Sequence, residues 1–170
     1  MKLKNMKIKI SKFNYFLTKD KRGSFAKLLS SINNRKILKK DRIIEINLSI
    51  NKKKGTIRGM HYQIGKYKEK KIIYCLQGKV YDVAIDINKN SKQYLKSQIN
   101  ILTPKLQKYI IIPEDYAHGF QTLENNTILL YLHSKAFNRK YEKTLNPLNK
   151  DLKINWPIKN IIISQKDKKA

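Results

Sequence analysis

The sequence predicts an all-β protein built as an antiparallel sandwich or jelly-roll barrel, and three observations support this prediction. Eight short segments with strand-like composition follow one another between residues 43 and 133. Turn signals separate these segments, with little helical periodicity between them, as is typical of antiparallel sandwiches and barrels. With 170 residues, the chain has the length of one domain, 1–170, that can bury a substantial core.

Ahead of these strands, the sequence predicts an arm, a turn and one short helix. Residues 1–16 contain alternating apolar side chains, as in a short strand or arm. The segment Asp20-Lys21-Arg22-Gly23 has the composition of a turn. Ser24 is a suitable helix N-cap, and the apolar residues after it recur at helical spacing: Phe25, Leu28, Leu29 and Ile32. The pair Asn33-Asn34 ends this predicted helix.

The predicted strands begin after Arg42. In chain order they cover residues 43–47, 56–63, 71–77, 79–87, 98–102, 109–112, 119–123 and 128–133. Turn-forming residues such as Gln77-Gly78 and Glu124-Asn125-Asn126 separate neighbouring strands. The sequence contains no internal repeat and no linker-like stretch.

Residues 55–63, Gly-Thr-Ile-Arg-Gly-Met-His-Tyr-Gln, bring a cation, an imidazole and an amide close together. Their near alternation predicts a strand, and Gly59 within it predicts a bulge or a close backbone approach. Strict alternation would direct Arg58 and His61 to opposite faces, whereas a bulge would place both on one face. That arrangement suits an anionic ligand beside a proton-transferring histidine. The alternative is a polar strand end in which His61 only satisfies a backbone group.

Charged or titratable side chains fall among apolar neighbours on several strands. Alternation places Asp82 and Asp86 on one face of their strand, and Tyr131 with His133 on one face of theirs. Such groups are costly to bury unless they border a wet or occupied cavity, so a ligand cavity is expected. The alternative is that these faces meet solvent. For Lys71 taken alone, exposure to solvent is the better explanation.

Lysine dominates the charge of the chain. The 38 lysines and arginines against 12 acidic residues give a net charge of +26. Such a charge is typical of proteins that bind nucleic acid or anionic membranes. However, the lysines are spread over the whole length, without an arginine cluster, a basic helix or zinc-finger spacing. We therefore expect no nucleic-acid or membrane partner, and we expect the charge to speed the arrival of a small anionic substrate.

Cys75 is the single cysteine of the chain. It cannot form an internal disulfide and fits a reducing compartment. Residues 1–12 lack the apolar run of a signal peptide, and no stretch approaches the roughly 20 apolar residues of a membrane span. The sequence therefore predicts a cytoplasmic protein.

Two further stretches contain candidate functional residues. In residues 110–120, an apolar strand enters a proline turn that presents His118 just before a glycine. Proline and glycine restrict the backbone on both sides of this histidine. In the tail, Trp156-Pro157 and an apolar segment precede Asp167. A solvated carboxylate is the usual interpretation of an aspartate so close to the end of the sequence.

Together these motifs resemble the dTDP-4-dehydrorhamnose 3,5-epimerase family, nucleotide-sugar epimerases with a cupin-like jelly roll. The resemblance runs in the family's order from about residue 20 to residue 167. Its most specific part combines Arg-Gly-Met-His-Tyr-Gln with Ala-His-Gly-Phe. The other matching segments are residues 20–25, 47–49, 71, 77–78, 81–86, 113–120, 130–131, 156–157 and 164–167.

The resemblance implies a cupin-like jelly-roll barrel with short flanking helices and a reaction that needs no cofactor or metal. In that family the histidine matching His61 is the general base, and the aspartate matching Asp167 orients it. The tyrosine matching Tyr131 is the general acid on the opposite face of the sugar, and Lys71 matches a lysine near the keto oxygen. A cation there stabilises the enolate that forms when a C–H bond beside a ketone breaks.

The resemblance also implies a nucleotide-diphospho sugar as substrate and a homodimer as the assembly. Arg22 and Arg58 match residues that hold the diphosphate, with Arg22 reaching into the partner subunit's site. The other candidate substrate-binding residues are Gln63, His118 and Phe137. The expected reaction inverts C3 and C5 of a dTDP-4-keto-6-deoxyhexose.

Several positions depart from the family pattern. Glu45 replaces a frequent glutamine, one residue is inserted among residues 52–54, and Asp115 replaces a glycine. Ala136-Phe137 stands where a pair of tyrosines is common, in a region that influences whether one or two carbons are inverted. A single-carbon epimerase acting on another 4-keto sugar therefore remains an alternative.

Two alternatives of other classes also remain. A metal-dependent cupin oxygenase usually needs two histidines two residues apart, and Gln63 occupies the second of those places. A non-catalytic sugar- or nucleic-acid-binding barrel would tolerate the loss of His61.

Overall fold

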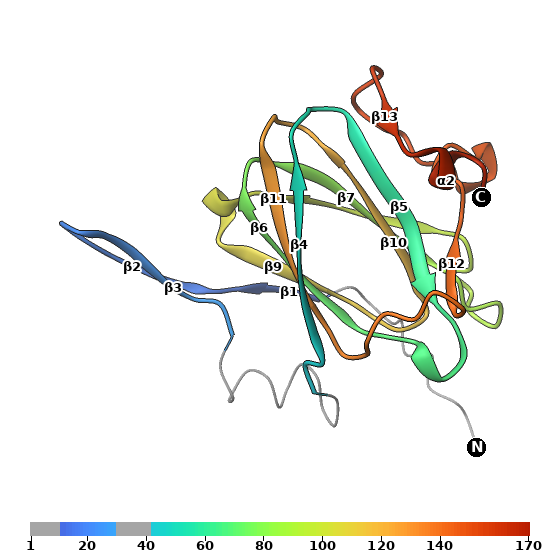
Figure 1. Ribbon diagram of the computed structural model, residues 1–170, viewed down its shortest axis with the longest axis horizontal. Helices are drawn as coiled ribbons and strands as arrows, with labels where there is room; N and C mark the ends of the chain where they lie inside the picture. Colours follow the sequence, from blue (N-terminus) through green and yellow to red (C-terminus); the bar gives the residue numbers. More distant parts are fainter. Residues whose placement is uncertain (1–10, 30–41) are drawn as a thin grey trace.

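The structure, a computed structural model, describes residues 11–29 and 42–170. Two sheets face each other and form a barrel, while a separate two-stranded hairpin projects from one side (Figure 1). The described residues contain mostly strands, and nearly all ladders between them are antiparallel. The predicted all-β antiparallel jelly-roll barrel is thus confirmed.

The first sheet places β11 between β6 and β4. Its strands in spatial order are β1 (Ser11–Asn14), β9 (Lys108–Ile112), β6 (Lys71–Gln77), β11 (Thr127–His133) and β4 (Glu45–Asn51). In this register Tyr131 lies between Ile73 of β6 and Asn47 of β4. His133 lies opposite Lys71. Because side chains alternate along a strand, Tyr131 and His133 share one face.

The second sheet contains β5 between β12 and β10. Its strands in order are β12 (Glu142–Thr144), β5 (Thr56–Gln63), β10 (Tyr116–Thr122), β7 (Val80–Asp86) and β8 (Ser97–Leu102). The short strand β13 (Ile162–Ile163) pairs with β5 in parallel. This pairing brings the C-terminal segment alongside β5, as Figure 1 shows in red.

The core lies between the sheets, and both sheets are also covered on parts of their outer faces. Buried side chains from both sheets form the inner cluster, which contains Ile73, Cys75, Val80, Ala84, Leu102, Ile110, Ile112, Tyr116, Phe120 and Leu129. A second cluster joins the outer face of the second sheet to Leu152 and Trp156 of the C-terminal segment. Burial on both faces explains why these strands read as apolar runs rather than strict alternation.

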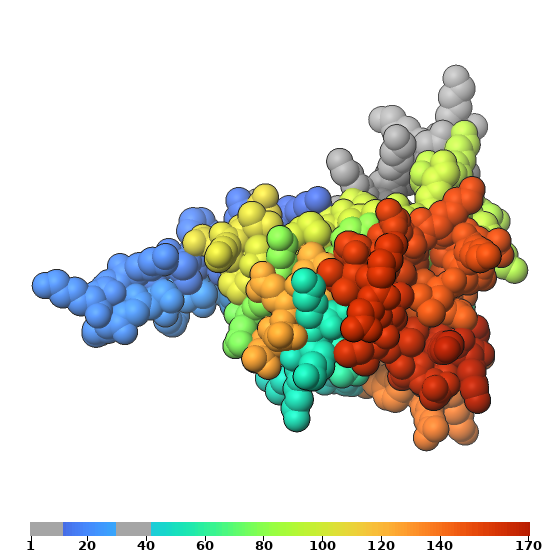
Figure 2. All heavy atoms as spheres, turned by 90° about the horizontal axis from the view of Figure 1, so that it is seen from above, coloured from blue at the N-terminus to red at the C-terminus, as the bar shows by residue number. Residues whose placement is uncertain are grey.

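The projecting hairpin consists of β2 (Phe16–Asp20) and β3 (Gly23–Lys27). Figures 1 and 2 show it extending away from the barrel. The turn predicted at residues 20–23 is confirmed, since Asp20 pairs with Gly23 across it. The helix predicted from Ser24 is wrong over residues 24–27, because their backbone groups pair with β2 instead. The rest of that predicted helix from residue 30 onward, like residues 1–10 of the arm, lies outside the described residues.

The remaining strand predictions differ from the structure mainly at their ends. β5 and β6 have the predicted bounds. β4 covers residues 45–51 rather than 43–47, and β10 begins at Tyr116 rather than at residue 119.

The described helices are short and lie outside the sheets. They are α2 (Gln165–Lys168) and the 3-10 helices η1 (Gly65–Tyr67), η2 (Pro104–Leu106) and η3 (Lys150–Leu152). Among the described residues, no helix has the length and apolar character required to cross a membrane.

Candidate active site

A cavity of about 270 Å³ opens between the two sheets. Its lining residues are Asn47, Leu48, Ser49, Arg58, His61, Tyr62, Gln63, Glu69, Lys71, His118, Phe120, Tyr131, His133, Phe137 and Glu142. The sequence-based candidates thus converge on one place, with the exceptions of Asp167, which lies behind His61, and Arg22. A cavity that collects titratable side chains is the usual form of an active site.

The bulge predicted at Gly59 is present and sets the direction of its neighbours. In the pairing of β5 with β10, three steps from Arg58 to His61 match only two steps on β10. Gly59 has a φ of +132°, and a Cβ atom there would lie 2.5 Å from the Cα atom of Gly119. The extra residue lets both Arg58 and His61 line the cavity, as the bulge hypothesis requires.

His61 is paired with the buried carboxylate of Asp167. The distance between His61 Nε2 and Asp167 Oδ1 is 2.8 Å, and Asp167 is 4% exposed. The backbone N–H of Gly59 donates to Asp167 Oδ2 at 3.4 Å. Because an ionised carboxylate only accepts hydrogen bonds, Nε2 carries the shared proton. Nδ1 is then the nitrogen of His61 that can accept a proton.

The C-terminal segment brings Asp167 to this position. β13 pairs with β5, and the next residue, Ser164, caps helix α2 by accepting a hydrogen bond from the backbone N–H of Asp167 at 3.1 Å. The cap starts the helix so that Asp167 turns back toward β5. The interpretation of Asp167 as a solvated carboxylate is therefore wrong.

The surroundings of His61 favour its neutral form. Burial lowers the pKa of His61 below its ordinary value of 6.5, and the Asp167 carboxylate opposes this shift. The net lowering leaves the imidazole largely neutral at pH 7. A neutral imidazole with a fixed tautomer has the form of a general base.

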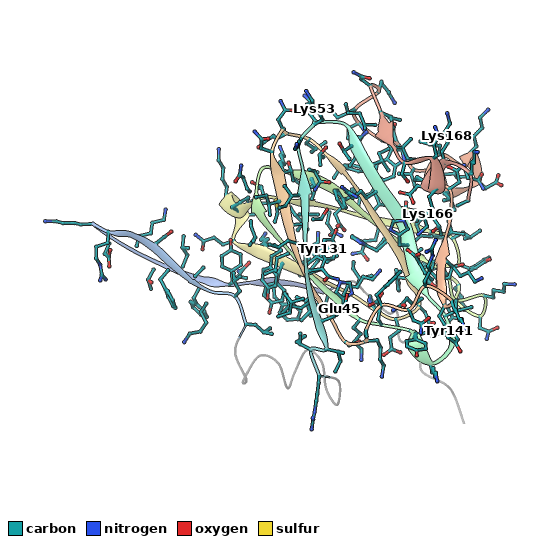
Figure 3. The ribbon with its side chains drawn as sticks, viewed as in Figure 1. Glu45, Lys53, Tyr131, Tyr141, Lys166 and Lys168 are labelled. Atoms are coloured by element: carbon teal, nitrogen blue, oxygen red, sulfur yellow. The ribbon has the colours of Figure 1, made fainter. Side chains whose placement is uncertain are left out.

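Tyr131 borders the cavity from the opposite sheet. Figure 3 shows it near the centre of the barrel, whereas Lys166 and Lys168 lie on the C-terminal segment. Its ring packs edge-on against His118, with 6.0 Å between ring centroids. Burial raises the pKa of Tyr131 well above its ordinary value, with Asp82 as a further cause. The phenol therefore keeps its proton at neutral pH and can donate it.

Lys71 is buried, so the explanation of solvent exposure is wrong for this residue. Its side chain lines the cavity and is 9% exposed. Its ammonium donates to the backbone carbonyl of His61 at 3.2 Å and lies 3.4 Å from Glu69 Oε1. A cation held in this way can stabilise negative charge that develops on a ligand.

The two aspartates of β7 have different surroundings. Asp82 is completely buried and lies 2.6 Å from His118 Nε2, which explains its place on the inner face. Asp86 instead accepts hydrogen bonds from the backbone N–H of Asn88 and the hydroxyl of Ser91. Asp86 therefore holds the loop after β7 and does not line the cavity.

The remaining candidates at the cavity differ in how accessible they are to a ligand. Arg58 is exposed, and its Nε donates to Asn51 Oδ1 at 2.8 Å. Gln63 is buried, and its amide group is already bonded to three backbone groups. Phe137 is 55% exposed at the edge of the cavity, where its backbone N–H donates to Glu45.

Arg22 lies away from this cavity. It sits in the turn of the hairpin, and its side chain is 90% exposed. Its guanidinium pairs with Asp20 at 2.6 Å. The structure therefore does not bring Arg22 to the site of its own chain.

Sequence reasoning did not single out Glu69. This residue is buried, lines the cavity and accepts a hydrogen bond from His133 Nδ1 at 2.8 Å. It lies just before β6, outside any strand, so the alternation of strand residues gave no information about it. Its neighbour Lys71, taken alone, was also better explained by exposure to solvent, so nothing in the sequence indicated that this segment is buried.

All three histidines of the chain pair with buried carboxylates at the cavity wall. The pairs are His61 with Asp167, His118 with Asp82, and His133 with Glu69. Within residues 11–29 and 42–170, no group of three or more histidine, cysteine or acidic side chains is arranged to hold a metal ion.

Comparison with known proteins identifies relatives over most of the chain. A dTDP-4-dehydrorhamnose 3,5-epimerase of Shigella flexneri is 34% identical over 114 residues, which are 67% of this chain and 63% of that protein. A dTDP-4-dehydrorhamnose 3-epimerase of Streptomyces niveus is 28% identical over 76% of this chain and 62% of its own length. The chain thus matches slightly less than two thirds of the length of these two relatives.

The fold has close counterparts among solved structures. The dTDP-6-deoxy-D-glucose-3,5-epimerase of Legionella pneumophila, in complex with dTDP-4-keto-L-rhamnose, superposes with a TM-score of 0.89. It is 28% identical, and the match covers 95% of this chain and 86% of that one. The family model of dTDP-4-dehydrorhamnose 3,5-epimerase matches residues 8–170. This chain therefore belongs to the dTDP-4-dehydrorhamnose 3,5-epimerase family.

Proposed function

We propose that this protein inverts C3 and C5 of a dTDP-4-keto-6-deoxyhexose, converting dTDP-4-dehydro-6-deoxyglucose to dTDP-4-dehydrorhamnose. One observation carries the proposal: a neutral histidine and a protonated tyrosine line opposite walls of one cavity. Inversion requires a proton to leave one face of the sugar ring and another to reach the opposite face. His61 and Tyr131 meet this requirement without a cofactor.

In the proposed reaction, Nδ1 of His61 removes the proton next to the ketone while Asp167 holds the ring in place. The electron pair of the broken C–H bond moves onto the keto oxygen and forms an enolate. The Lys71 ammonium stabilises this oxygen, and fixed charges of this kind commonly contribute a few kcal/mol. Tyr131 then donates its proton to the opposite face of the carbon, which completes the inversion.

The proposed substrate contacts follow the charges around the cavity. Arg58 at the mouth binds the diphosphate, which bidentate guanidinium groups recognise well. His118, held by Asp82, and the exposed ring of Phe137 complete the walls. Gln63 forms part of the cavity wall without donating to the substrate, because its amide is already bonded to backbone groups.

We also propose that the protein is a homodimer in which Arg22 reaches the site of the partner subunit. The hairpin that carries Arg22 projects from the barrel (Figures 1 and 2). Its Phe16 and Phe25 side chains are largely exposed. A row of apolar side chains at the edge of the first sheet is also more than half exposed: Ile44, just before β4, and Ile46, Leu48 and Ile50 within it. Such a row on an edge strand is typical of a surface that a second chain covers.

We further propose a cytoplasmic location for the protein. The single cysteine, Cys75, is buried and unpaired, which agrees with a reducing compartment.

Deuterium exchange provides the test of the reaction. The protein is incubated with dTDP-4-keto-6-deoxyglucose in deuterated water, and proton NMR follows the signals of C3 and C5. Exchange at both carbons with formation of dTDP-4-dehydrorhamnose is expected. Folded protein that exchanged neither carbon of this substrate, nor of other nucleotide-linked 4-keto sugars, would favour a binding barrel instead.

The same experiment distinguishes the second candidate, a single-carbon epimerase. This candidate is favoured by Phe137, which stands where the family commonly has tyrosine, and by the similarity to the Streptomyces niveus 3-epimerase. It predicts exchange at one carbon only. Exchange that spread to the second carbon in a Phe137→Tyr variant would identify this position as the cause.

A further inference from the structure

The carboxylate of Glu69 is buried in the wall of the cavity and each of its oxygens has its own cationic or N–H partner. Oε2 lies 2.8 Å from His133 Nδ1, and Oε1 lies 3.4 Å from Lys71 Nζ. The side chains of all three residues are at most 14% exposed. A buried carboxylate is stable only when such partners compensate for the loss of water. Glu69 therefore joins two residues that border the same ligand space.

The two partners of Glu69 are neighbours on adjacent strands. Lys71 of β6 lies opposite His133 of β11, and both line the cavity. The Lys71 ammonium also donates to the carbonyl oxygen of His61 at 3.2 Å. These two contacts, from Glu69 and from the backbone of β5, hold a long and flexible side chain from two sides. A lysine without such contacts would keep its rotamer freedom, which is large for this residue type.

The contact with Glu69 also fixes how His133 faces the ligand space. Because a carboxylate only accepts hydrogen bonds, Nδ1 of His133 carries a proton. Nε2 is then the nitrogen left for a ligand, beside the acid proposed above. The rings of His133 and Tyr131 lie nearly parallel, with 5.9 Å between their centroids and 18° between their planes.

We propose that Glu69 is a positioning residue for the epimerase reaction: it holds the Lys71 ammonium against the keto oxygen and orients His133 beside Tyr131. The proposal rests on the function proposed above. Stabilisation of a developing oxyanion depends on donors that are already in place, so a loosened Lys71 would weaken the transition state more than substrate binding.

The first test compares Glu69→Gln with a matched control, Glu114→Gln. Glu114 lies 3.4 Å from Lys70, the neighbour of Lys71, but it is partly exposed and does not line the cavity. We expect Glu69→Gln to lower kcat about 10- to 100-fold with KM changed less than about threefold, because removal of a complete oxyanion donor costs about 10²- to 10³-fold. Glu114→Gln should keep the parent kcat. Thermal unfolding of both variants identifies any loss caused by unfolded protein.

The second test does not depend on activity. In the parent protein labelled with ¹⁵N at histidine, the His133 signal, assigned by its loss in His133→Gln, should show a proton on Nδ1. A His133 ring protonated only on Nε2 would overturn the proposal, as would a folded Glu69→Gln variant with the parent kcat. A parent protein that turns over no nucleotide sugar would instead refute the proposed function. The protonation of His133 would then still show whether this ring donates a hydrogen bond to Glu69.

Discussion

At the scale of single residues, the proposed chemistry depends on which form His61 takes in the free protein. Burial lowers the pKa of His61, and Asp167 partly restores it. Since protonated imidazole cannot accept a proton, activity must fall as the pH drops through the pKa of His61. Tyr131 has the opposite role, and its raised pKa keeps the acid form available over the whole neutral range.

The acidic limb of kcat/KM against pH should therefore have its midpoint below 6.5, the ordinary pKa of histidine. In Asp167→Asn the midpoint should move to lower pH, because the carboxylate that raises the pKa of His61 is gone. The plateau should fall by up to about 10⁴-fold, as when asparagine replaces the aspartate that orients the histidine of a catalytic triad. The exposed Asp151 provides a matched control, and Asp151→Asn should leave the midpoint of the acidic limb unchanged. A limb that moved to higher pH in Asp167→Asn would contradict the assigned pair.

Tyr131→Phe should separate proton removal from inversion. His61 remains intact in this variant, so deuterium from solvent should still enter the substrate on the face from which the proton left. Inversion should be slowed about 10²- to 10⁴-fold, the usual contribution of a positioned acid. Proton NMR in deuterated water measures both quantities in one sample. Tyr94→Phe, which alters an exposed tyrosine away from the cavity, should behave as the parent does. Inversion at the parent rate in Tyr131→Phe would remove this tyrosine from the mechanism.

At the scale of elements, the bulge of β5 is what turns a strand into part of an active site. Gly59 has no Cβ, so β5 can approach Gly119 of β10 closely while it accommodates one extra residue. Strict alternation would direct Arg58 and His61 to opposite faces of the sheet. The glycine thus connects a local backbone conformation to the direction of two functional side chains.

Gly59→Ala should destabilise the protein more than Gly23→Ala, although both glycines have a positive φ. Gly23, with φ +136°, has open space around its Cβ position, so its substitution adds only backbone strain of about 1–3 kcal/mol. Gly59→Ala adds overlap with Gly119 and His118, which should cost about 1–3 kcal/mol more. Urea unfolding measures the difference, and a displaced His61 should also lower kcat. Equal unfolding midpoints for the two variants would show that the close approach is relaxed without cost.

The sequence alone predicted the strands best where turn residues flank them on both sides. The bounds of β5 and β6 were correct because glycines and polar turns flank them. The helix expected from Ser24 was wrong over residues 24–27, because a few apolar residues at helical spacing carry less information than the hairpin pairing with β2. This pairing closes over the turn predicted at residues 20–23, and such a short turn between two segments is typical of a hairpin.

The site was predictable to different degrees for different residues. Alternation and the Gly59 bulge were sufficient to expect Arg58 and His61 on one face, and the resemblance supplied Asp167 from the distant tail. Neither could indicate that Asp167 is buried, since that depends on the pairing of β13 with β5. Glu69 was missed because it precedes β6 and because its partner, His133, belongs to a different strand. Their contact depends on how the strands pair, which the sequence pattern does not show.

At the scale of the whole molecule, the projecting hairpin forms a sheet of its own outside the two sheets of the barrel. Its turn places Arg22 in solvent, and its aromatic side chains are largely exposed. A symmetric dimer that exchanges the projecting hairpins would account for both features. The partner subunit would cover the apolar side chains, and its site would receive Arg22. Because the site of each subunit needs Arg22 of the partner in the proposed dimer, a monomeric variant such as Ile46→Lys, which places a charge in the exposed row of β4, should also lose activity. Light scattering measures the oligomeric state in the same sample.

Subunit mixing should show whether Arg22 acts in the partner's site. Arg22→Ala should raise KM about tenfold or more through the loss of a charge-assisted contact to the diphosphate, and His61→Asn should be inactive. In a mixed dimer, the cavity of the Arg22→Ala chain keeps His61 and receives an intact hairpin. Co-expression at random should therefore restore about a quarter of the sites, measured at substrate concentrations far below the KM of Arg22→Ala. If Arg22 served its own chain, both cavities of the mixed dimer would be defective and mixing would restore nothing. Lys21→Ala, which alters the neighbouring residue in the same turn, should need no complementation.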